Sequence, residues 1–190
     1  MSPSRNPFKK KKSTSRTKIT CVAGNIVTIG TDVIVNAANS KLREGAGVCG
    51  AIFKAAGSAE LQKACDQHGH CPTGSAVITQ SFRISQHGTK HIVHAVGPIY
   101  SANNVTECDG QLVDAYRSAL KLAESVGARS IAIPAISTGI FGFPEKRAAQ
   151  LEAELLTTET FNLDVIALMA LESSKVKTYA DALASASLIG

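Results

Sequence analysis

The chain has 190 residues, of which 44% are hydrophobic and only 5% are aromatic. This composition is typical of one globular domain with an aliphatic core, and it argues against a wholly disordered protein. No apolar run approaches the ~20 residues of a transmembrane helix, and the N-terminus has no apolar secretory segment, so we expect no membrane contact. Five cysteines without such a segment favour a reducing compartment. We expect the cytoplasm, with the nucleus as an alternative.

Positive charge is concentrated at the N-terminus. The net charge is +5, but residues 1–18 hold seven Lys or Arg and no Asp or Glu, leaving 13 basic against 15 acidic residues elsewhere. We expect residues 1–17 to form a disordered basic tail and residues 18–190 to form a single domain. Three roles fit such a tail: a solubilising arm, a contact with RNA or another polyanion, and a nuclear import signal.

Short β-rich runs alternate with helical patterns, which predicts an α/β fold with a mostly parallel sheet covered on both faces. In chain order, the expected elements are strands 19–22, 25–29 and 32–36, helices 47–56 and 59–67, strands 76–79 and 91–95, helix 109–126, strand 130–133, a helix from residue 144, strand 165–171 and helix 175–184. A turn is expected at residues 86–89. The long helix shows apolar residues at helical spacing and ends before Gly127.

Residues 33–40 and 131–142 are the most informative segments. Each is an apolar, β-branched run that ends in small and polar residues, as a buried parallel strand does where it delivers a loop to the carboxyl edge of a sheet. Ligands of open α/β sheets bind at that edge. Residues 137–142 and the Gly45–Gly47 segment before a helix can both offer backbone N–H groups to phosphate. We therefore predict a phosphorylated ligand, with an ordinary glycine-rich turn as the alternative at Gly45–Gly47.

Five motifs occur together in an order that resembles the macro domain family. They are Gly24-Asn25-Ile26, Val35-Asn36-Ala37-Ala38-Asn39, Gly45-Ala46-Gly47-Val48-Cys49-Gly50-Ala51-Ile52, His94-Ala95-Val96-Gly97-Pro98 and Ile136-Ser137-Thr138-Gly139. The resemblance covers roughly residues 18–184. It implies a three-layer α/β/α macro domain fold with a mostly parallel, mixed central sheet. It also implies ADP-ribose as the ligand, with no metal or organic cofactor.

The resemblance also assigns ligand-binding residues. They are Asn25, Ile26, Ala37, Asn39, Gly45, Ala46, Gly47, Val48, Ser137, Thr138, Gly139, Ile140 and Phe141. Residues 45–48 and 137–142 would clasp the pyrophosphate and distal ribose, with Phe141 as a lid or, alternatively, a core residue. Asn25 stands where the family usually has an Asp that accepts a hydrogen bond from adenine. Losing the charge costs about 1 kcal/mol, unless Asn25 is only a turn residue.

The catalytic residues implied by the resemblance are Asn39, Gly47 and Cys49. Cellular hydrolases of the family have Asp where this chain has Cys49 and His where it has Phe53. Some viral members share the Gly-Val-Cys sequence and include active hydrolases, in which a water positioned by the substrate phosphate is thought to attack. Asn39 would orient the distal ribose, whereas Asn36 would fasten the loop backbone. A Cys49 nucleophile is an alternative.

Other polar residues have structural interpretations. His94 lies in an apolar strand, which is typical of a hydrogen-bonded core histidine, with a catalytic role as the alternative. The segment from Cys65 to Cys71 holds two Cys and two His, but the spacing matches no common zinc pattern, so we interpret Cys65 as a small core residue.

We expect a monomer that binds ADP-ribose or an ADP-ribosylated protein. The expected reaction is hydrolysis of an ADP-ribosyl ester or of O-acetyl-ADP-ribose. A reader of ADP-ribose without turnover is one alternative. A nucleic-acid-binding protein that works through the basic tail is the other.

Overall fold

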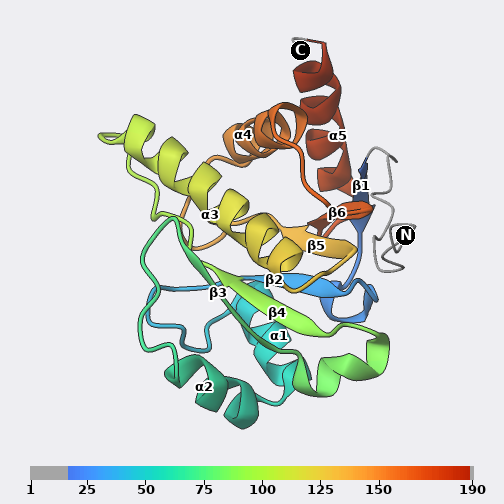
Figure 1. The fold of residues 1–190 in the computed structure, drawn as a ribbon. Coiled ribbons are helices and arrows are strands. Elements are labelled where there is room, and N and C mark those ends of the chain that lie inside the picture. Colours follow the sequence, from blue (N-terminus) through green and yellow to red (C-terminus); the bar gives the residue numbers. More distant parts are fainter. Residues whose placement is uncertain (1–16, 189–190) are drawn as a thin grey trace, which may run out of the picture.

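A sheet of six strands separates two layers of helices (Figure 1). The structure is a computed structural model, and it describes residues 17–188. The strands are β1 (Lys18–Ala23), β2 (Val33–Ala37), β3 (Ala76–Gln80), β4 (His91–Ala95), β5 (Ser130–Pro134) and β6 (Val165–Ala170). The α-helices are α1 (Gly47–Ala56), α2 (Ser58–Asp66), α3 (Val105–Ser125), α4 (Glu145–Thr158) and α5 (Ser173–Ser187). Two 3₁₀ helices, η1 (Ile26–Thr28) and η2 (Phe82–His87), complete the described elements.

The strand order in the sheet is β1-β6-β5-β2-β4-β3. All neighbouring strands are parallel except β3 and β4, which pair antiparallel at one edge. Helices α1 and α2 cover one face, and α3, α4 and α5 cover the other (Figure 1). The three-layer α/β/α fold with a mostly parallel, mixed sheet is confirmed.

Each face of the sheet carries its own hydrophobic core. Successive side chains of a strand point to opposite faces, so one strand feeds both cores. Val33 and Val35 of β2 pack with residues of α3, α4 and α5, whereas Ile34 packs with residues of α1 and α2. All three side chains are fully buried, which explains why this strand is continuously apolar rather than alternating.

The strand predicted at residues 25–29 is wrong, because this segment forms η1. The Asn25 side chain accepts a hydrogen bond from Val27 N at 3.1 Å, and Thr28 N donates to Asn25 O at 3.2 Å. Ile26 and Val27 are both buried in the core beneath the sheet, which an alternating strand does not permit. The β-branched residues favoured a strand, but the capping asparagine and burial of consecutive side chains favour a tight helical turn.

Most other predicted elements are present with different ends. Helix α3 begins at Val105, four residues before the predicted start, and α5 runs over Ser173–Ser187 rather than 175–184. Helix η2 extends the expected turn at residues 86–89 back to Phe82. No helix within residues 17–188 combines the length and hydrophobicity that crossing a bilayer requires.

The predicted tail at residues 1–17 lies outside the described residues except for Thr17. The Thr17 hydroxyl donates to the carbonyl oxygens of Phe161 and Leu163, at 3.0 and 2.8 Å. Lys18 N then donates to Asp164 O at 2.8 Å, which starts β1 beside β6. Thr17 is therefore tied to the domain by hydrogen bonds, whereas the predicted tail at residues 1–16 stays a prediction.

Candidate functional site

The strand order of the sheet reverses between β2 and β5, so the connections that follow these two strands lead to opposite sides of the sheet. From β2 it passes through α1 and α2 to β3 and β4 on one side, whereas from β5 it passes through α4 to β6 on the other. The two strands pair only at Val33–Ile131 and Ile34–Ala132, so their carboxyl ends separate. Such a switch point is where open α/β sheets bind ligands. The loops that follow β2 and β5 both start there (Figure 1).

The loop after β2 is held by the side chain of Asn39. Its Nδ2 donates to Arg43 O at 2.7 Å, and its Oδ1 accepts from Arg43 N at 3.1 Å. Between these two residues, Leu42 is buried and has a backbone φ of 55°, a value that residues other than glycine rarely adopt. Asn39 therefore fixes the shape of this loop with both of its polar atoms.

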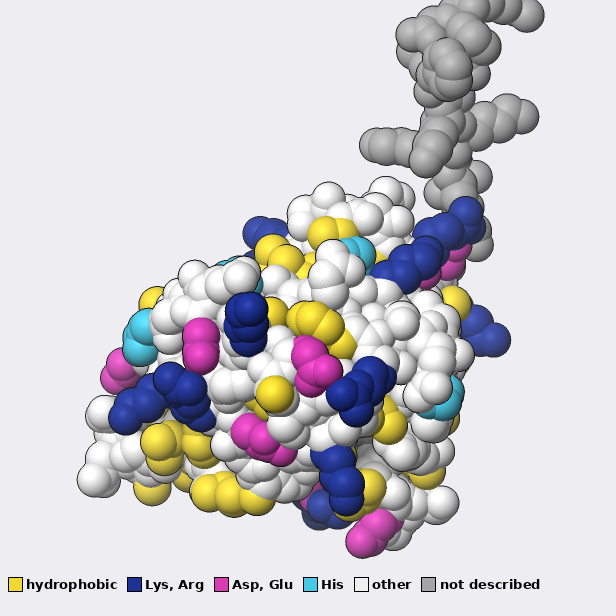
Figure 2. Space-filling view, turned by 90° about the horizontal axis from the view of Figure 1, so that it is seen from below, with side chains coloured by type: hydrophobic (Ala, Val, Ile, Leu, Met, Phe, Trp, Pro, Cys, Tyr) yellow, Lys and Arg dark blue, Asp and Glu magenta, His cyan; other side chains and the backbone are white. Residues whose placement is uncertain are grey.

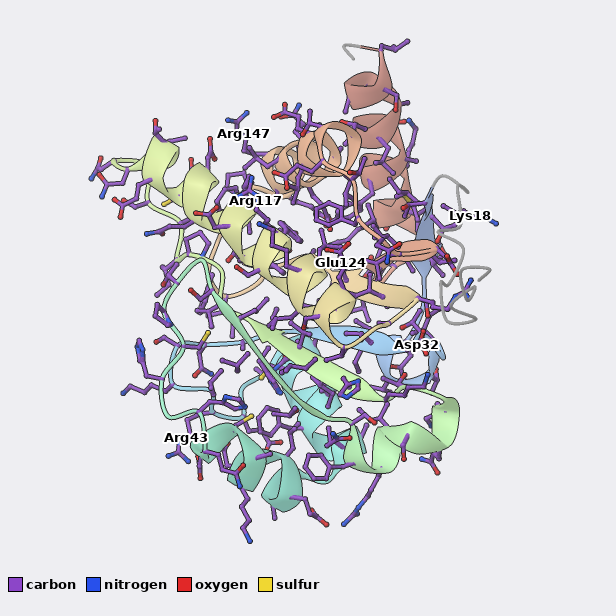
Figure 3. All side chains as sticks on the ribbon, in the orientation of Figure 1. Lys18, Asp32, Arg43, Arg117, Glu124 and Arg147 are labelled. Atoms are coloured by element: carbon purple, nitrogen blue, oxygen red, sulfur yellow. The ribbon has the colours of Figure 1, made fainter. Side chains whose placement is uncertain are left out.

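Helix α2 holds the same loop from outside. Gln62 accepts a hydrogen bond from Glu44 N at 3.2 Å and donates to Leu42 O at 3.1 Å. Arg43 forms an ion pair with Asp66 of α2 at 3.2 Å. Figure 3 shows Arg43 beside α2, well away from Asp32 at the amino end of β2. The sequence analysis did not identify Gln62, since nothing in its local pattern separates it from any exposed helical glutamine.

The loop then enters α1 with free backbone donors. Within residues 17–188, the N–H groups of residues 46–49 have no hydrogen-bond acceptor. Gly47 has a φ of +61°, and a Cβ there would meet no atom within 4 Å. Gly50 is required for a different reason, because a Cβ would lie 2.5 Å from Gly45 O. The open helix N-terminus is therefore suited to bind an anion.

The loop after β5 carries a second set of free donors. The N–H groups of residues 137–141 have no acceptor in the part of the chain that the structure describes. The loop is closed by hydrogen bonds from Gly142 N to Gly139 O and from Phe143 N to Ser137 O, both at 2.9 Å. Ser137 has a φ of +65°, and successive amides around such a residue form an anion-binding concavity.

A hollow of about 280 Å³ lies between the first residues of the loop after β2, the segment after β4 and the loop after β5, and only Asn39 and Phe141 of the predicted ligand-binding residues line it. It is lined by Asn39, Ser40, Lys41, Thr73, Val96, Gly97, Ile99 and Phe141. Of these lining residues, only Lys41 carries an ionisable side chain. A larger groove of about 500 Å³ lies between α3, α4 and α5, and it is lined by none of the residues predicted to bind ligand.

The family model described as macro domain matches residues 35–151, which include both loops and the hollow between them. This chain belongs to the macro domain family. The protein named O-acetyl-ADP-ribose deacetylase of Escherichia fergusonii is 44% identical over 146 residues, covering 75% of this chain and 80% of that protein. The family assignment made from five motifs is confirmed.

Solved structures agree with this assignment. The Oceanobacillus iheyensis macrodomain with ADP has a TM-score of 0.81 and 33% identity, covering 91% of this chain and 92% of that one. The Trypanosoma brucei macrodomain in complex with ADP-ribose has a TM-score of 0.74 and 29% identity, covering 90% and 69%.

Asn25 lies at the N-terminus of η1. Asn25 is exposed, and its Oδ1 accepts from Val27 N, so it is the N-cap of this helix. The Ile26 side chain is buried, which leaves only its main chain for any ligand contact. Among the described residues, Ile26 N has no acceptor. Asn25 remains a predicted adenine contact and Ile26 a predicted ligand contact, and the turn role of Asn25 is observed as well.

The structural roles of Asn36 and Asn39 differ from those predicted. Asn36 was expected to fasten the loop backbone, but Asn39 does so. Asn36 is buried beneath the sheet, where its Nδ2 lies 3.1 Å from His94 Nδ1 and 3.6 Å from Cys49 Sγ. The physical reason is strand alternation, because Asn36 points into the core that also contains His94, on the neighbouring strand β4.

His94 is a buried, hydrogen-bonded core histidine, as expected. Its Nδ1 faces the Asn36 amide, and its Nε2 lies 3.0 Å from Thr79 Oγ1. With Asn36 Nδ2 as donor, the neutral ring carries its proton on Nε2 and donates it to Thr79. Burial lowers the pKa of His94 to about 4, so the ring is neutral at physiological pH.

Cys49 lies at the end of this network nearest the site. Its thiol is 3.6 Å from Asn36 Nδ2 and 3.8 Å from Arg43 O, and its side chain is buried. Burial raises the pKa of the Cys49 thiol despite the hydrogen bond from Asn36. A protonated thiol is a poor nucleophile, so the local chemistry favours packing over covalent catalysis.

The cysteine and histidine segment at residues 65–71 is divided by the fold. Cys65 and Cys71 are buried, whereas His68 and His70 are exposed. Within residues 17–188, no group of three or more His, Cys, Asp or Glu side chains is placed to hold a metal ion. Cys65 packs in the core between the sheet, α1 and α2, as a small hydrophobic residue.

Charged residues on the α1 and α2 face are mixed in sign. Lys and Arg side chains there alternate with Asp and Glu (Figure 2). Arg83 and Glu60 pair at 2.8 Å. At the amino end of β2, Asp32 accepts hydrogen bonds from Lys90 and from Arg129 N, which lower its pKa although burial opposes this. The Asp32 contacts thus lie at the end of β2 opposite the site.

Proposed function

We propose that this macro domain binds ADP-ribose and hydrolyses an ester that links it to an acyl group. The observation that carries this proposal is the pair of loops with free N–H groups, residues 46–49 and 137–141, at the switch point between β2 and β5. A diphosphate has enough oxygens to accept from both loops. The relative named O-acetyl-ADP-ribose deacetylase, and the neighbouring structures with ADP and ADP-ribose, support the choice of ligand.

The proposed chemistry is ester hydrolysis by orientation of the substrate. Water attacks the acyl carbon, the bond from that carbon to the ribose oxygen breaks, and the ribose oxygen takes up a proton. The products are ADP-ribose and a carboxylate. The eight residues that line the hollow include no carboxylate and no imidazole, so the proposal assigns no side-chain general base there. The loops contribute by positioning the substrate and by stabilising negative charge with N–H groups.

Two substrates share this ester chemistry. One is O-acetyl-ADP-ribose, and the other is ADP-ribose attached to an acidic side chain of a protein. Both carry an acyl group on the distal ribose, and we expect this group to enter the hollow that Thr73, Ile99 and Phe141 help to line. Free ADP-ribose released from each substrate is the common product.

Calorimetry and a release assay test the proposal in turn. We expect ADP-ribose to bind with a dissociation constant of about 1 to 10 μM, and AMP to bind far more weakly because it lacks the second phosphate and the distal ribose. The protein at substoichiometric concentration should then release ADP-ribose from both ester substrates over many turnovers. Equal affinity for AMP and ADP-ribose would remove residues 46–49 and 137–141 from the site.

A reader without turnover is the second candidate function. The chain has Cys49 and Phe53 at the positions where cellular hydrolases of the macro domain family have Asp and His. Both side chains are buried in this chain. A single-turnover assay with enzyme in excess separates the candidates. Absence of ADP-ribose release under those conditions, together with normal ADP-ribose binding, identifies a reader.

RNA binding through residues 1–16 is tested separately. RNA affinity that falls steeply with salt, and disappears when these residues are removed, would support the third candidate. The mixed charges of the α1 and α2 face make that described surface a poor alternative site for RNA (Figure 2).

A further inference from the structure

The main-chain amide of Ile136 has an unusual acceptor. Strand β5 ends at Pro134, so Ile136 N has left the sheet and needs another partner. The hydroxyl of Tyr116, on α3, accepts its hydrogen bond at 3.2 Å. Tyr116 is 0% exposed and Ile136 is 1% exposed, so water does not compete for this bond. Ile136 directly precedes Ser137, the first residue of the loop with five free amides.

Tyr116 reaches this amide from the helical layer above the sheet. Around it lie the carboxyl of Glu152 on α4 and the hydroxyl of Tyr179 on α5, and both residues are almost fully buried. Burial first, and then the nearby Glu152 carboxyl, raise the pKa of Tyr116 well above its ordinary value. The Tyr116 hydroxyl therefore stays neutral and is available as an acceptor.

The loop conformation needs such support. Ser137 has a φ of +65°, a conformation that costs free energy for a residue with a side chain and persists only where its surroundings fix it. Gly97 contacts Ile136 and Ser137 from one side. The bond from Phe143 N to Ser137 O closes the loop from another. Tyr116 supplies the contact from the third side, at the residue where the strand turns into the loop.

We propose that Tyr116 is a positioning residue of the loop at residues 137–142, holding Ile136 so that the free amides of that loop face the diphosphate before it binds. This inference rests on the proposed function for its ligand. Without the Tyr116 hydroxyl, the Ile136 amide turns toward another acceptor and the loop becomes ordered only on binding. Ordering a loop during binding costs affinity.

Tyr116→Phe and Tyr179→Phe form a matched pair of variants. Each removes one buried hydroxyl from the same helical layer, but only the Tyr116 hydroxyl accepts the hydrogen bond from Ile136 N, directly before the loop. The Tyr179 hydroxyl has no hydrogen-bond partner among the described residues. By calorimetry, we expect Tyr116→Phe to bind ADP-ribose about fivefold to tenfold more weakly than wild type. We expect Tyr179→Phe to bind within twofold of wild type, with both variants folded.

Hydrogen exchange in the absence of ligand provides an independent readout. The amides of Tyr100, Gly142 and Phe143 donate to residues of the loop, so their exchange reports on its order. We expect all three to exchange faster in Tyr116→Phe and unchanged in Tyr179→Phe. In the release assay, KM should rise in Tyr116→Phe while kcat stays within twofold, because Tyr116 contacts no reacting atom.

The outcomes distinguish this inference from the proposed function. Equal weakening of ADP-ribose binding in both variants would mean that any lost hydroxyl in this layer has the same effect, and would overturn the positioning role. Unchanged exchange at the three amides in Tyr116→Phe would overturn it as well. If wild type binds no ADP-ribose, the proposed function fails, and the exchange comparison alone decides the role of Tyr116.

Discussion

Gly97 lies so close to Ser137 that a Cβ on Gly97 would stand 2.2 Å from Ser137 Oγ and 2.6 Å from Ile136 Cγ2. Both contacted residues are buried, so neither can move aside into solvent. The segment after β4 and the loop after β5 are therefore fitted to each other through the absence of one side chain. Any residue but glycine at position 97 must displace the loop that carries the free amides.

Gly97→Ala should weaken ADP-ribose binding by at least about tenfold and lower the melting temperature. The added methyl group overpacks a buried contact, which costs about 1–3 kcal/mol. Calorimetry and a thermal melt measure the two effects. Gly110→Ala is the matched control, because a Cβ at Gly110 on α3 meets no atom within 4 Å. Gly110→Ala should bind normally, and normal binding by Gly97→Ala would show that the two segments are not coupled.

Gly139→Val should abolish ADP-ribose binding and leave the domain folded. Gly139 does not have a positive φ, and a Cβ there would meet no atom within 4 Å, so the fold tolerates the side chain. The branched side chain would instead fill the space in which phosphate approaches the loop amides. Circular dichroism checks the fold, and calorimetry checks binding. Micromolar affinity in the folded variant would exclude this loop from the site.

The fold and the loops of the site were predictable because their signals are local. Residues 33–40 and 131–142 each place a buried strand directly before small and polar residues, and that pattern alone indicates a loop at the carboxyl edge of a sheet. The family motifs then supplied the three-layer fold class with its mostly parallel, mixed sheet, and the predicted ligand class. These are properties that a single strand or loop carries within itself.

The contacts that shape the loops could not be predicted, because they join segments far apart in the chain. Gly97 and Ser137 come from different strands, and Tyr116 meets Ile136 from another layer. Asn36 and Asn39 occupy one motif, but Asn36 lies within β2 opposite His94 of β4, whereas Asn39 lies beyond the end of the strand. The strand predicted at residues 25–29 was wrong for a related reason. The β-branched residues suggested a strand, whereas Asn25 caps a tight turn in which Ile26 and Val27 both enter the same core.

Asn25→Asp should tighten ADP-ribose binding by about 1 kcal/mol, roughly fivefold. Aspartate caps a helix as well as asparagine does, so the bond to Val27 N is kept. The added charge should strengthen the predicted hydrogen bond that the adenine amino group donates to residue 25. Calorimetry with ADP-ribose measures the gain. An analogue with hypoxanthine in place of adenine is the control, because it lacks that amino group and should gain nothing. Equal gains for both ligands would mean that residue 25 does not face the base.

The buried histidine should make stability depend on pH. His94 has a pKa of about 4 in the folded protein against 6.5 for an ordinary histidine, so the unfolded chain binds more protons between these values. Its contribution is complete above pH 6.5 and is lost as the pH falls toward 4, by about 3 kcal/mol at most. Denaturant unfolding at several pH values should show a flatter profile for His94→Gln than for wild type. His87→Gln, which changes an exposed histidine, should keep the wild-type profile; a steep profile in His94→Gln would assign the loss to other groups.

Variants of Asn39 and Cys49 test how the proposed reaction proceeds. Asn39→Ala should reduce ADP-ribose release by at least about tenfold, because it frees Arg43 and the loop that leads into α1, and misplaced substrates react slowly. Asn39→Asp is the graded control, since it keeps the acceptor for Arg43 N and loses only the donor to Arg43 O. Its rate should fall between those of wild type and Asn39→Ala.

Cys49→Ala should keep at least about a third of the wild-type rate. The Cys49 thiol is buried beneath Arg43 O and its pKa is raised, so it contributes packing rather than a thiolate, and alanine is a similarly small replacement. A nucleophilic thiol would be indispensable, and its loss would abolish release altogether. ADP-ribose release from an ester substrate, measured at equal concentrations of wild type and variants, separates these results. If Cys49→Ala released no ADP-ribose but still bound it normally, covalent catalysis by the thiol would be favoured over hydrolysis by substrate orientation.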